Sequence, residues 1–411
     1  MSITSNLMGH AKPQVSIAVP GRWHAFDLAK GLHQAGALHR LITIYPKSFT
    51  RKWDIPDSKV RTLPFLIYIQ RGAQRYLPNR LSKCVNSLVL RCFSFFAFCV
   101  MGTPEVVHAW SGSSSGIFKR AKSRGILCIL ERSSSHIREQ YSILSQEAST
   151  LGIPFDTDWA ETFKAEEDGY RDAARIFVPS LFVFSSMVKR GISEDKLFLN
   201  GFGADLSVFK PANDRQHKGL RVICAGSKSY RKGLRYLIQA FKDAQIEGST
   251  LTLVGGGCEE IKHLIVDSKN IKNHPRVPQN QLVDFYQGSD LFVHSSIEEG
   301  QSMVQLQALA CGLPLVCTRN TGGEDLLRML SKKPLRLDKN IEQYPAGFVV
   351  DAKDADALVY CIKHLDEQPE LLASMKGAAR RMRDGPFSWM DYALRNLVEY
   401  ERLLVARSKD G

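Results

Sequence analysis

The sequence lacks the features of disulfide-rich, secreted and membrane-spanning proteins. Its nine cysteines are odd in number and contain no CxxC pair, which disfavours a disulfide framework and indicates a reduced cytoplasmic protein. No stretch approaches the roughly 20 apolar residues that cross a bilayer. The first residues, MSITSNLMGHAKPQ, have neither the cationic nor the apolar region of a signal peptide. We therefore predict a cytoplasmic chain that is soluble or peripheral at the inner face of a membrane.

Acidic residues are scarce near the N-terminus. The first 100 residues contain 14 Lys and Arg against 3 Asp and Glu, so they carry +11 of the net charge of +13. The sequence has no RNP pattern, zinc-finger spacing or convincing helix-turn-helix, which argues against a nucleic-acid partner. An anionic membrane surface or an acidic acceptor is consistent with this charge, as is a basic surface that is merely well solvated.

The length and composition indicate an ordinary globular protein with two domains. A chain of 411 residues exceeds the size at which a single core usually keeps growing. Hydrophobic residues make up 44% and charged residues 24%, which leaves no room for a long low-complexity segment. No internal repeat is present.

Short β-branched or apolar runs alternate with helical patterns along the chain, which predicts parallel α/β sheets. The first series includes QVSIAVP, HRLITIY, EVVHAW, GILCILE and ARIFVPS, and the second includes LRVICAG, STLTLVG, DLFVHSS and PLVCT. The alternation pauses at residues 206–219. We predict two doubly wound domains, residues 1–210 and 211–385, and a C-terminal helix in residues 386–411 that crosses back to the first domain. A ligand site is expected in the cleft between the two sheets.

Several patterns are weak signals. The turn Val254–Gly257 lacks the full dinucleotide-binding spacing. Residues 156–158 and 354–356 match the short DxD pattern of metal-dependent transferases, but neither has a metal-site context, so we predict no metal. The apolar run LVLRCFSFFAFCVMG, residues 88–102, is interrupted by Arg91 and is interpreted as a buried helix in preference to a membrane contact.

The most specific motif is SSIEEGQSMVQLQALACGLPLVCTRNTGG, residues 295–323, which follows an apolar strand and leads into a helix. Free amides at a helix N-terminus can hold an anion or a sugar. With this motif the chain resembles the retaining glycosyltransferases of family 4, and NGFGADLSVFKP, RKG and VGGG extend the resemblance over nearly the whole chain. The resemblance implies the GT-B architecture, in which two Rossmann-like domains face each other across a cleft.

The resemblance also implies a set of donor contacts in the second domain. Glu299 corresponds to the acid that accepts hydrogen bonds from the donor sugar, helped by the backbone of Gly300, Gln301, Ser302 and Met303. The second acid of the motif is replaced by Gln307, so an amide stands where a carboxylate usually meets the ribose. The turn CAGSKSYRKG corresponds to the phosphate-contacting turn, with Lys232 at the diphosphate. Ser227 replaces a frequent arginine, and Arg231 or Lys228 is expected to share its role.

Candidate contacts in the first domain are fewer. Gly21 is predicted to be a donor-binding residue, because a glycine there would allow the donor or the acceptor to approach the backbone closely. Arg22 and His24 open the first helix and are candidates for the acceptor side, although a histidine there is often a cap or a packed ring. His136 resembles the cleft histidine of the family and is predicted to act near the sugar; alternatively it is an exposed residue beside a serine-capped helix.

The predicted function is that of a metal-independent retaining glycosyltransferase without a cofactor. It would move a sugar from a nucleoside-diphosphate sugar to a hydroxyl of a glycan, a lipid-linked acceptor or a small molecule, and Lys232, Glu299 and His136 would be its catalytic residues. The alternatives are a catalytically weak or inactive nucleotide-sugar binding protein, which the Gln307 replacement keeps open, a phosphorylase-like or starch-synthase-like enzyme, and a nicotinamide dehydrogenase. The nucleobase, the sugar and the acceptor are not specified by the sequence.

Overall fold

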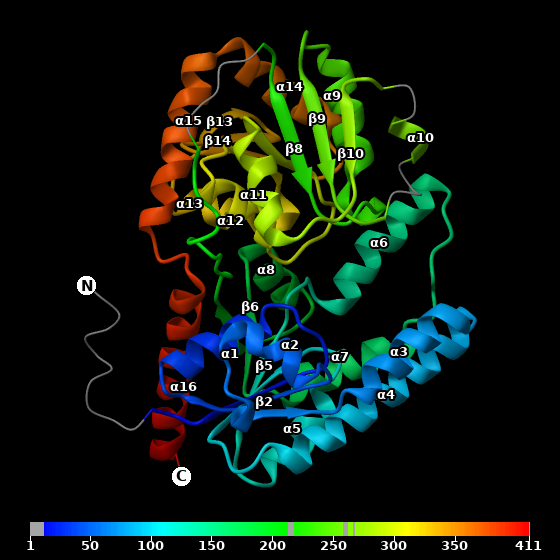
Figure 1. The fold of residues 1–411 in the computed structure, drawn as a ribbon, viewed down its shortest axis with the longest axis vertical. Coiled ribbons are helices and arrows are strands. Elements are labelled where there is room, and N and C mark those ends of the chain that lie inside the picture. The colour runs from blue at the N-terminus through cyan, green and yellow to red at the C-terminus, as the bar shows by residue number, and fades with distance from the viewer. Residues whose placement is uncertain (1–11, 213–217, 258–261, 266–267, 411) are drawn as a thin grey trace.

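The computed structural model describes residues 12–212, 218–257, 262–265 and 268–410. Two α/β domains are stacked along the long axis of the molecule, each built on one mainly parallel sheet with helices on both faces (Figure 1). The first sheet ends at Leu199 and the second begins at Arg221. This arrangement confirms the predicted pair of doubly wound domains. The predicted boundary segment, residues 206–219, and the first residues of the chain include positions outside the described ranges.

The N-terminal domain has a seven-stranded parallel sheet with strand order β3-β2-β1-β4-β5-β6-β7. Its central strands β1, β4 and β5 are buried on both faces, as expected for a parallel sheet covered by helices. The strands are β1 (Val15–Val19), β2 (Leu38–Thr43), β3 (Val60–Thr62), β4 (Val106–Trp110), β5 (Leu127–Glu131), β6 (Arg175–Val178) and β7 (Leu197–Leu199). The helices are α1 (Ala25–Gln34), α2 (Lys47–Thr50), α3 (Phe65–Tyr76), α4 (Asn79–Val100), α5 (Ser115–Lys122), α6 (Ile137–Leu151), α7 (Ala160–Asp172) and α8 (Leu181–Lys189).

The C-terminal domain has an eight-stranded sheet with strand order β10-β9-β8-β11-β12-β15-β14-β13. Strands β13 and β14 are antiparallel to their neighbours and form one edge. The strands are β8 (Arg221–Ala225), β9 (Thr250–Val254), β10 (Ile271–His274), β11 (Leu291–His294), β12 (Leu315–Thr318), β13 (Leu335–Asp338), β14 (Ile341–Tyr344) and β15 (Gly347–Val350). The helices are α9 (Leu234–Ala244), α10 (Lys262–Ile265), α11 (Gln279–Gln287), α12 (Met303–Ala310), α13 (Gly323–Arg328), α14 (Ala355–Glu367) and α15 (Pro369–Arg381).

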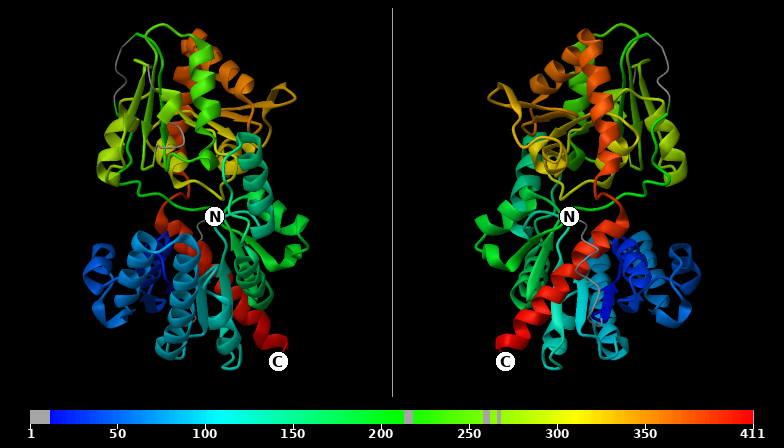
Figure 2. Two further views of the ribbon diagram at one scale, coloured as in Figure 1. Left: turned by 90° about the vertical axis from the view of Figure 1, so that its right-hand side faces the viewer. Right: turned by 90° about the vertical axis from the view of Figure 1, so that its left-hand side faces the viewer.

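The last helix, α16 (Trp389–Asp410), leaves the second domain and packs against α1 of the first (Figure 2). Tyr392 and Tyr400 of this helix are fully buried in the core of the first domain. Gly31 permits the close approach of α1 and α16, since a Cβ there would lie 2.4 Å from the Cβ of Ala393. The C-terminal segment is therefore a structural part of the N-terminal domain.

Helix α4 covers one side of the first sheet and differs from its predicted buried environment. Its inner face supplies Val89, Phe93 and Ala97 to the core, whereas Leu88 and Phe95 on its outer face are exposed. Among the described helices, α4 is the one in which a stretch, Arg80–Val100, is long and apolar enough to cross a membrane by length and composition alone. A helix that is apolar on both faces can be covered on only one side when it lies at the edge of a domain.

Candidate active site

The candidate site begins at the turn between β8 and α9, which lies at the carboxyl end of the second sheet. Gly226 has a φ of +141°, and a Cβ on the neighbouring Gly255 would lie 1.6 Å from the Gly226 carbonyl oxygen. Gly233 ends the turn with a φ of +60°, and a Cβ there would lie 2.0 Å from the carbonyl oxygen of Ser295. Only glycine fits these positions, so the turn can lie flat against the following loop. The side-chain stem of Lys232 lies over Gly226.

The loop after β11 is hydrogen-bonded to this turn and fixes its geometry. The backbone N–H of Ile297 donates to the carbonyl of Arg231 (2.9 Å), and the hydroxyl of Ser295 donates to the carbonyl of Lys232 (3.1 Å). The N–H of Glu299 donates to the carbonyl of Asn320 (2.9 Å). The two cationic residues of the turn and the acidic residues of the loop are therefore held side by side.

Lys232 and Glu299 form an ion pair at the centre of the site. Both side chains are largely buried, and the guanidinium of Arg231 lies 3.8 Å from the other carboxylate oxygen of Glu299. Burial opposes ionisation of Glu299, but the charges of Lys232 and Arg231 outweigh it and lower its pKa to about 2. Glu299 is thus a fixed anion at neutral pH, and the motif residues Lys232, Arg231 and Glu299 form one cluster.

Glu298, the residue before Glu299, was not singled out by the sequence and joins the two domains. Its carboxylate is fully buried and accepts hydrogen bonds from the N–H and hydroxyl of Ser135 (3.1 and 2.8 Å) and from Gln140 (3.2 Å) in the first domain. It also accepts from Arg231 (2.8 Å) in the second domain. The available signal in the sequence was the second acid of the pair Glu298–Glu299, since the motif assigns only one of the two to the donor sugar.

Gly300 and Gln301 lie directly at the contact between the domains. A Cβ on Gly300 would lie 1.8 Å from the carbonyl oxygen of Ser133, and the Gly300 carbonyl accepts a hydrogen bond from Ser180 (2.7 Å). The side-chain oxygen of Gln301 accepts from the N–H of Phe202 (2.5 Å). The backbone predicted to support the donor sugar is therefore also held by the first domain.

Four further predicted donor residues lie on the β8–α9 turn and at or within helix α12. Ser227 is exposed on the turn, Ser302 precedes α12, and Met303 begins that helix and packs against the core of the first domain. Gln307 is only 4% exposed, and its amide oxygen accepts a long hydrogen bond (3.5 Å) from the buried hydroxyl of Tyr286. The structure brings Gln307 next to Tyr286 rather than to the Lys232–Glu299 pair. Its predicted ribose contact stays a prediction.

His136 lies at the N-terminus of α6 and is buried. Its Nδ1 accepts a hydrogen bond from the N–H of Arg138 (3.2 Å), so the histidine itself caps the helix. Burial, reinforced by the charge of Arg132, lowers its pKa to about 4 and keeps the ring neutral at pH 7. The alternative of an exposed His136 beside a serine cap is wrong, because His136 is buried and is itself the cap. Its predicted role near the sugar stays a prediction.

Three residues predicted to contact ligand follow β1, namely Gly21 on the donor side and Arg22 and His24 on the acceptor side. Gly21 lies under the ring of Trp23, and the guanidinium of Arg22 lies over the ring of Trp53 at 5.4 Å from its centroid. His24 is buried, and its Nε2 lies 3.1 Å from a carboxylate oxygen of Glu131. The packed-ring alternative therefore describes the environment of His24.

Glu131 joins His24 to a second buried histidine. Its other oxygen lies 3.1 Å from Nε2 of His108, whose Nδ1 lies 2.5 Å from the hydroxyl of Tyr400. Burial opposes ionisation of the Glu131 carboxyl. Hydrogen bonds from His108 and His24 outweigh that effect and lower the pKa of Glu131 to about 2. This network fastens α16 to the first sheet beneath the cleft.

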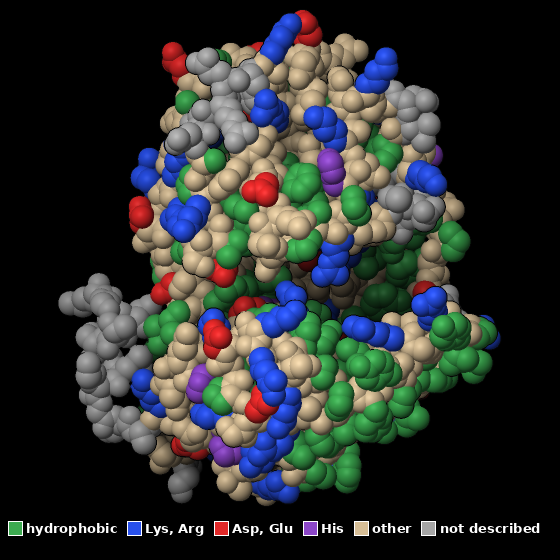
Figure 3. Space-filling view, in the orientation of Figure 1, with side chains coloured by type: hydrophobic (Ala, Val, Ile, Leu, Met, Phe, Trp, Pro, Cys, Tyr) green, Lys and Arg blue, Asp and Glu red, His purple; other side chains and the backbone are tan. Residues whose placement is uncertain are grey.

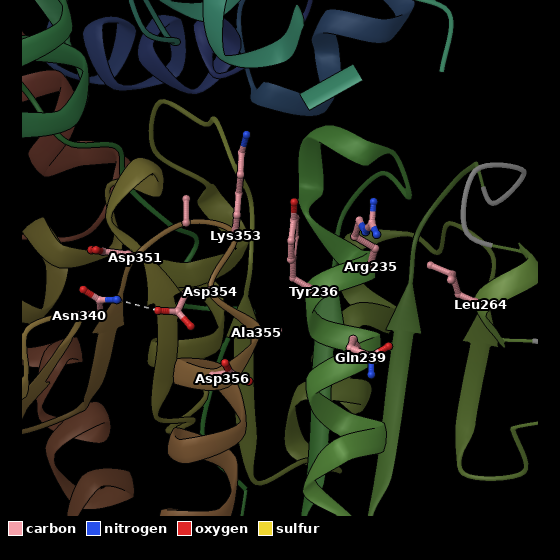
Figure 4. Close-up of a pocket in the computed structure, with 11 residues that line it drawn as sticks. Arg235, Tyr236, Gln239, Leu264, Asn340, Asp351, Lys353, Asp354, Ala355 and Asp356 are labelled. Atoms are coloured by element: carbon pink, nitrogen blue, oxygen red, sulfur yellow. Dashed lines mark hydrogen bonds between the residues drawn. The ribbon is translucent and has the colours of Figure 1, made fainter. Parts of the chain in front are cut away.

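A separate cavity of about 660 Å³ lies in the second domain between α9 and the loop before α14 (Figure 4). None of the predicted site residues lines it. Asp354, part of one DxD pattern, caps α14 by accepting from the N–H of Ala357 (2.9 Å), and Asp156 of the other pattern pairs with Lys83. Within the described part of the chain, no three His, Cys, Asp or Glu side chains are arranged to hold a metal ion.

Comparison with known proteins adds to this geometry. Residues 208–382 match the family model described as glycosyl transferases group 1. The chain is 28% identical over 240 residues to a D-inositol 3-phosphate glycosyltransferase of Paenarthrobacter aurescens, covering 53% of this chain and 55% of that protein. It is 25% identical over 224 residues to a GDP-mannose-dependent monoacylated alpha-(1-6)-phosphatidylinositol monomannoside mannosyltransferase of Corynebacterium glutamicum, covering 48% of this chain and 55% of that protein. The chain thus spans about half the length of these curated relatives.

The fold comparison extends over nearly the whole chain. The sucrose-phosphate synthase structure from Thermosynechococcus elongatus superimposes with a TM-score of 0.70 at 18% identity, covering 96% of this chain and 100% of that chain. This likeness confirms the GT-B architecture, and the sequence matches confirm the resemblance of the second domain to glycosyltransferases.

Proposed function

We propose that this chain, whose second domain resembles the group 1 glycosyl transferases, moves a sugar from a nucleoside-diphosphate sugar to an acceptor hydroxyl. The observation that carries the proposal is the Lys232–Glu299 pair. It places a cation beside a carboxylate, at the carboxyl end of a parallel sheet and at the contact between two domains. Ligands of α/β sheets bind at this edge. The cation suits a diphosphate, and the carboxylate suits sugar hydroxyls.

The residues of the turn would act mainly on the departing nucleotide. Negative charge builds on the diphosphate as the bond between the anomeric carbon and the phosphate oxygen breaks, and Lys232 would stabilise this charge. Arg231 would share this role from its position beside Glu299. In the proposed reaction the acceptor oxygen attacks the anomeric carbon on the face that the phosphate leaves. Its proton passes to the leaving phosphate oxygen, and the anomeric configuration is retained.

Positioning by two domains would supply the rest of the catalysis. Glu299 would orient the sugar, and Glu298 would hold the β5–α6 loop of the acceptor domain against the donor domain through Ser135. Holding both substrates in one geometry converts an encounter of two molecules into a single-molecule step. The proposed reaction uses neither a metal ion nor a cofactor, because side chains and backbone amides supply the charge stabilisation.

The acceptor is proposed to carry its hydroxyl on a glycan or on a lipid headgroup. The names of the two relatives contain an inositol phosphate and a phosphatidylinositol mannoside, and the second relative is GDP-mannose-dependent. We place the enzyme in the cytoplasm, peripheral to the inner face of a membrane. The basic first domain is consistent with this location.

The test has two stages. Thermal melting with UDP, GDP, ADP, NAD and NADP ranks the nucleotides, because a ligand at 100 times its dissociation constant stabilises the fold by about 2.7 kcal/mol. The preferred nucleoside diphosphate, carrying radiolabelled sugars, is then incubated with glycan and lipid acceptors, with and without EDTA. Retained activity in EDTA is expected, and NMR of the product should show a retained configuration. Donor binding without product across the panel would instead support a binding protein, and a preference for NAD would contradict the proposal.

A further inference from the structure

The outer face of the α3–α4 hairpin is an apolar surface that no other described element covers. Eight of the sixteen exposed large hydrophobic side chains among the described residues lie between Phe65 and Phe95. Figure 3 shows hydrophobic side chains gathered on this side of the first domain, below the hollow between the domains. Monomeric soluble proteins rarely leave a contiguous apolar patch of this kind without a partner.

The exposed apolar residues follow helical spacing. On α4 they include Leu81, Cys84, Leu88, Cys92 and Phe95, at intervals of three or four residues, so they form one stripe along the helix. The α3 stripe runs through Phe65, Tyr68, Ile69 and Tyr76, and the two helices pack against each other. Leu88 and Phe95 are 61% and 58% exposed. Together these residues form what we call the α3–α4 face.

The α3–α4 hairpin itself carries only basic charges, whereas two acidic residues from outside the hairpin, Asp156 and Glu161, contact Lys83 and Ser87 of α4. Between Asp57 and Glu105 the sequence has no acidic residue. Arg71 and Arg75 on α3 and Arg91 on α4 are exposed, and among the described residues no carboxylate pairs with them. Near the C-terminal end of α4, the guanidinium of Arg124 lies 3.9 Å from the ring centroid of Phe98. An apolar stripe rimmed by arginines matches a surface of acyl chains beneath anionic headgroups.

We propose that the α3–α4 face docks this protein on the surface of an anionic phospholipid bilayer. The apolar stripe would enter the boundary between headgroups and acyl chains, with Tyr68 and Tyr76 at headgroup level and the arginines on phosphates. Because α3 begins directly after β3, whose carboxyl end faces the second domain, docking brings the cleft near the bilayer. Docking does not depend on sugar transfer. The consequence that the acceptor is a membrane lipid rests on the proposed function.

The structure favours a bilayer over other occupants of this face. A second copy packed about a two-fold axis would bring the arginine rims of both copies together, and juxtaposed like charges are costly. Nucleic acid offers phosphates to the arginines but little contact to apolar side chains such as Ile69 and Leu88. Spanning is disfavoured because the opposite face of α4 supplies Val89, Phe93 and Ala97 to the domain core. Docking in the plane of the bilayer leaves that core intact.

The binding test uses the full chain and vesicles of phosphatidylcholine with or without 30% phosphatidylglycerol. We expect at least tenfold tighter binding to the anionic vesicles at low salt, and weaker binding at high salt. The double variant Leu88→Ser/Phe95→Ser should bind about 100-fold more weakly, because two large apolar side chains no longer enter the bilayer. The variant Arg71→Gln/Arg75→Gln should lose roughly 30-fold on anionic vesicles only. Leu335→Ser, an exposed leucine on β13 of the other domain, is the matched control and should bind like the wild type.

A second measurement keeps the large apolar side chains of the α3–α4 face, including Leu88 and Phe95. Cys84, Cys92 and Cys99 are exposed on α4. A polarity-sensitive fluorophore is attached to Cys92 after Cys84, Cys99 and Cys258 are changed to serine. Its emission should shift to the blue on anionic vesicles and be quenched by brominated acyl chains. An unchanged emission on bound vesicles would overturn the proposal.

Three other outcomes would also overturn the proposal. They are equal binding to both vesicle types, displacement of the protein from vesicles by RNA, and a dimer in sedimentation equilibrium that Leu88→Ser/Phe95→Ser dissociates. Donor binding by thermal melting is measured in parallel. Loss of docking with donor binding and transfer retained would overturn only this inference, whereas docking without donor binding would overturn only the proposed function.

Discussion

Glu298 of the second domain accepts two hydrogen bonds from Ser135 of the first, at 3.1 and 2.8 Å, although the residues are 163 positions apart in the chain. The same carboxylate accepts from Arg231, whose neighbour Lys232 pairs with Glu299. The contact between the domains and the candidate donor site therefore share one charged network. A change in the angle between the domains would therefore disturb the contact between Glu298 and Arg231 as well.

Removing the Glu298 side chain should lower the free energy of unfolding. We expect Glu298→Ala to lower the free energy of unfolding by about 1 to 3 kcal/mol, since it leaves the buried N–H and hydroxyl of Ser135 without their acceptor, whereas Arg231 keeps the backbone carbonyl of residue 298 and the Glu299 carboxylate nearby. Glu247→Ala, which breaks the exposed pair with Lys218, should change it by less than about 0.5 kcal/mol. Urea unfolding measures both variants. A double-mutant cycle with Ser135→Ala should give a coupling energy above about 0.5 kcal/mol. Additive changes in unfolding free energy would show that the contact between Glu298 and Ser135 does not stabilise the fold.

Lys232→Ala should lower kcat by about 100-fold or more while changing acceptor KM little. The cation is needed most when charge develops on the diphosphate in the transition state. Lys218→Ala, which removes an exposed lysine of the same domain, is the control. Steady-state kinetics with the preferred donor measures kcat and the acceptor KM of both variants. An unchanged kcat in Lys232→Ala would show that Lys232 has no part in the mechanism.

Glu299→Ala should abolish selection among donor sugars while free nucleoside diphosphate binds as well as before or more tightly. The substitution removes a sugar contact and also frees Lys232 from its ion pair, so the cation becomes available to phosphate. Calorimetric titration of the nucleoside diphosphate and of two sugar donors measures both effects. Equal loss of affinity for all three ligands would show that Glu299 supports the whole site.

Gln307→Ala should weaken nucleotide affinity by about tenfold or less, because a neutral hydrogen bond contributes roughly 0.5 to 1.5 kcal/mol. The buried position beside Tyr286 adds a second expectation, a lower melting temperature from the cavity left behind. Titration of the nucleotide and its 2'-deoxy form separates the two roles. The same deoxy penalty in wild type and variant would mean that Gln307 supports α12 and does not contact the ribose.

Stability should fall as the pH is lowered from 7 to 4. The folded-state pKa of His136 is about 4 and that of His294 about 3, both below the unfolded value near 6.5, because burial disfavours the charged ring. The unfolded chain therefore binds more protons below pH 6.5, and stability decreases with acidification. His136→Gln should reduce the slope of unfolding free energy against pH between 6.5 and 4. An identical slope in urea unfolding would place the pH dependence elsewhere.

Much of the fold was predictable because periodicity records which side chains are buried. Runs such as LRVICAG and STLTLVG predicted β8 and β9 to within a residue or two. The edge strands were not predicted. β13 has the pattern LRLD and is largely exposed, so no apolar alternation marks it, and its pairing with β14 is decided by the turn and by neighbours in the sheet.

The sequence by itself determined the α/β class and the two-domain plan, because these depend on local spacing and on apolar periodicity. The family resemblance of its motifs singled out Lys232 and Glu299, but the ion pair between them, 67 positions apart, is a tertiary contact. Only the tertiary structure decided which neighbour each remaining side chain meets. It turned Glu298 toward Ser135, buried His24 against Glu131, placed Gln307 beside Tyr286 and left Leu88 exposed. Local patterns specify which face of an element is apolar or charged, whereas the element that covers that face comes from a distant part of the chain.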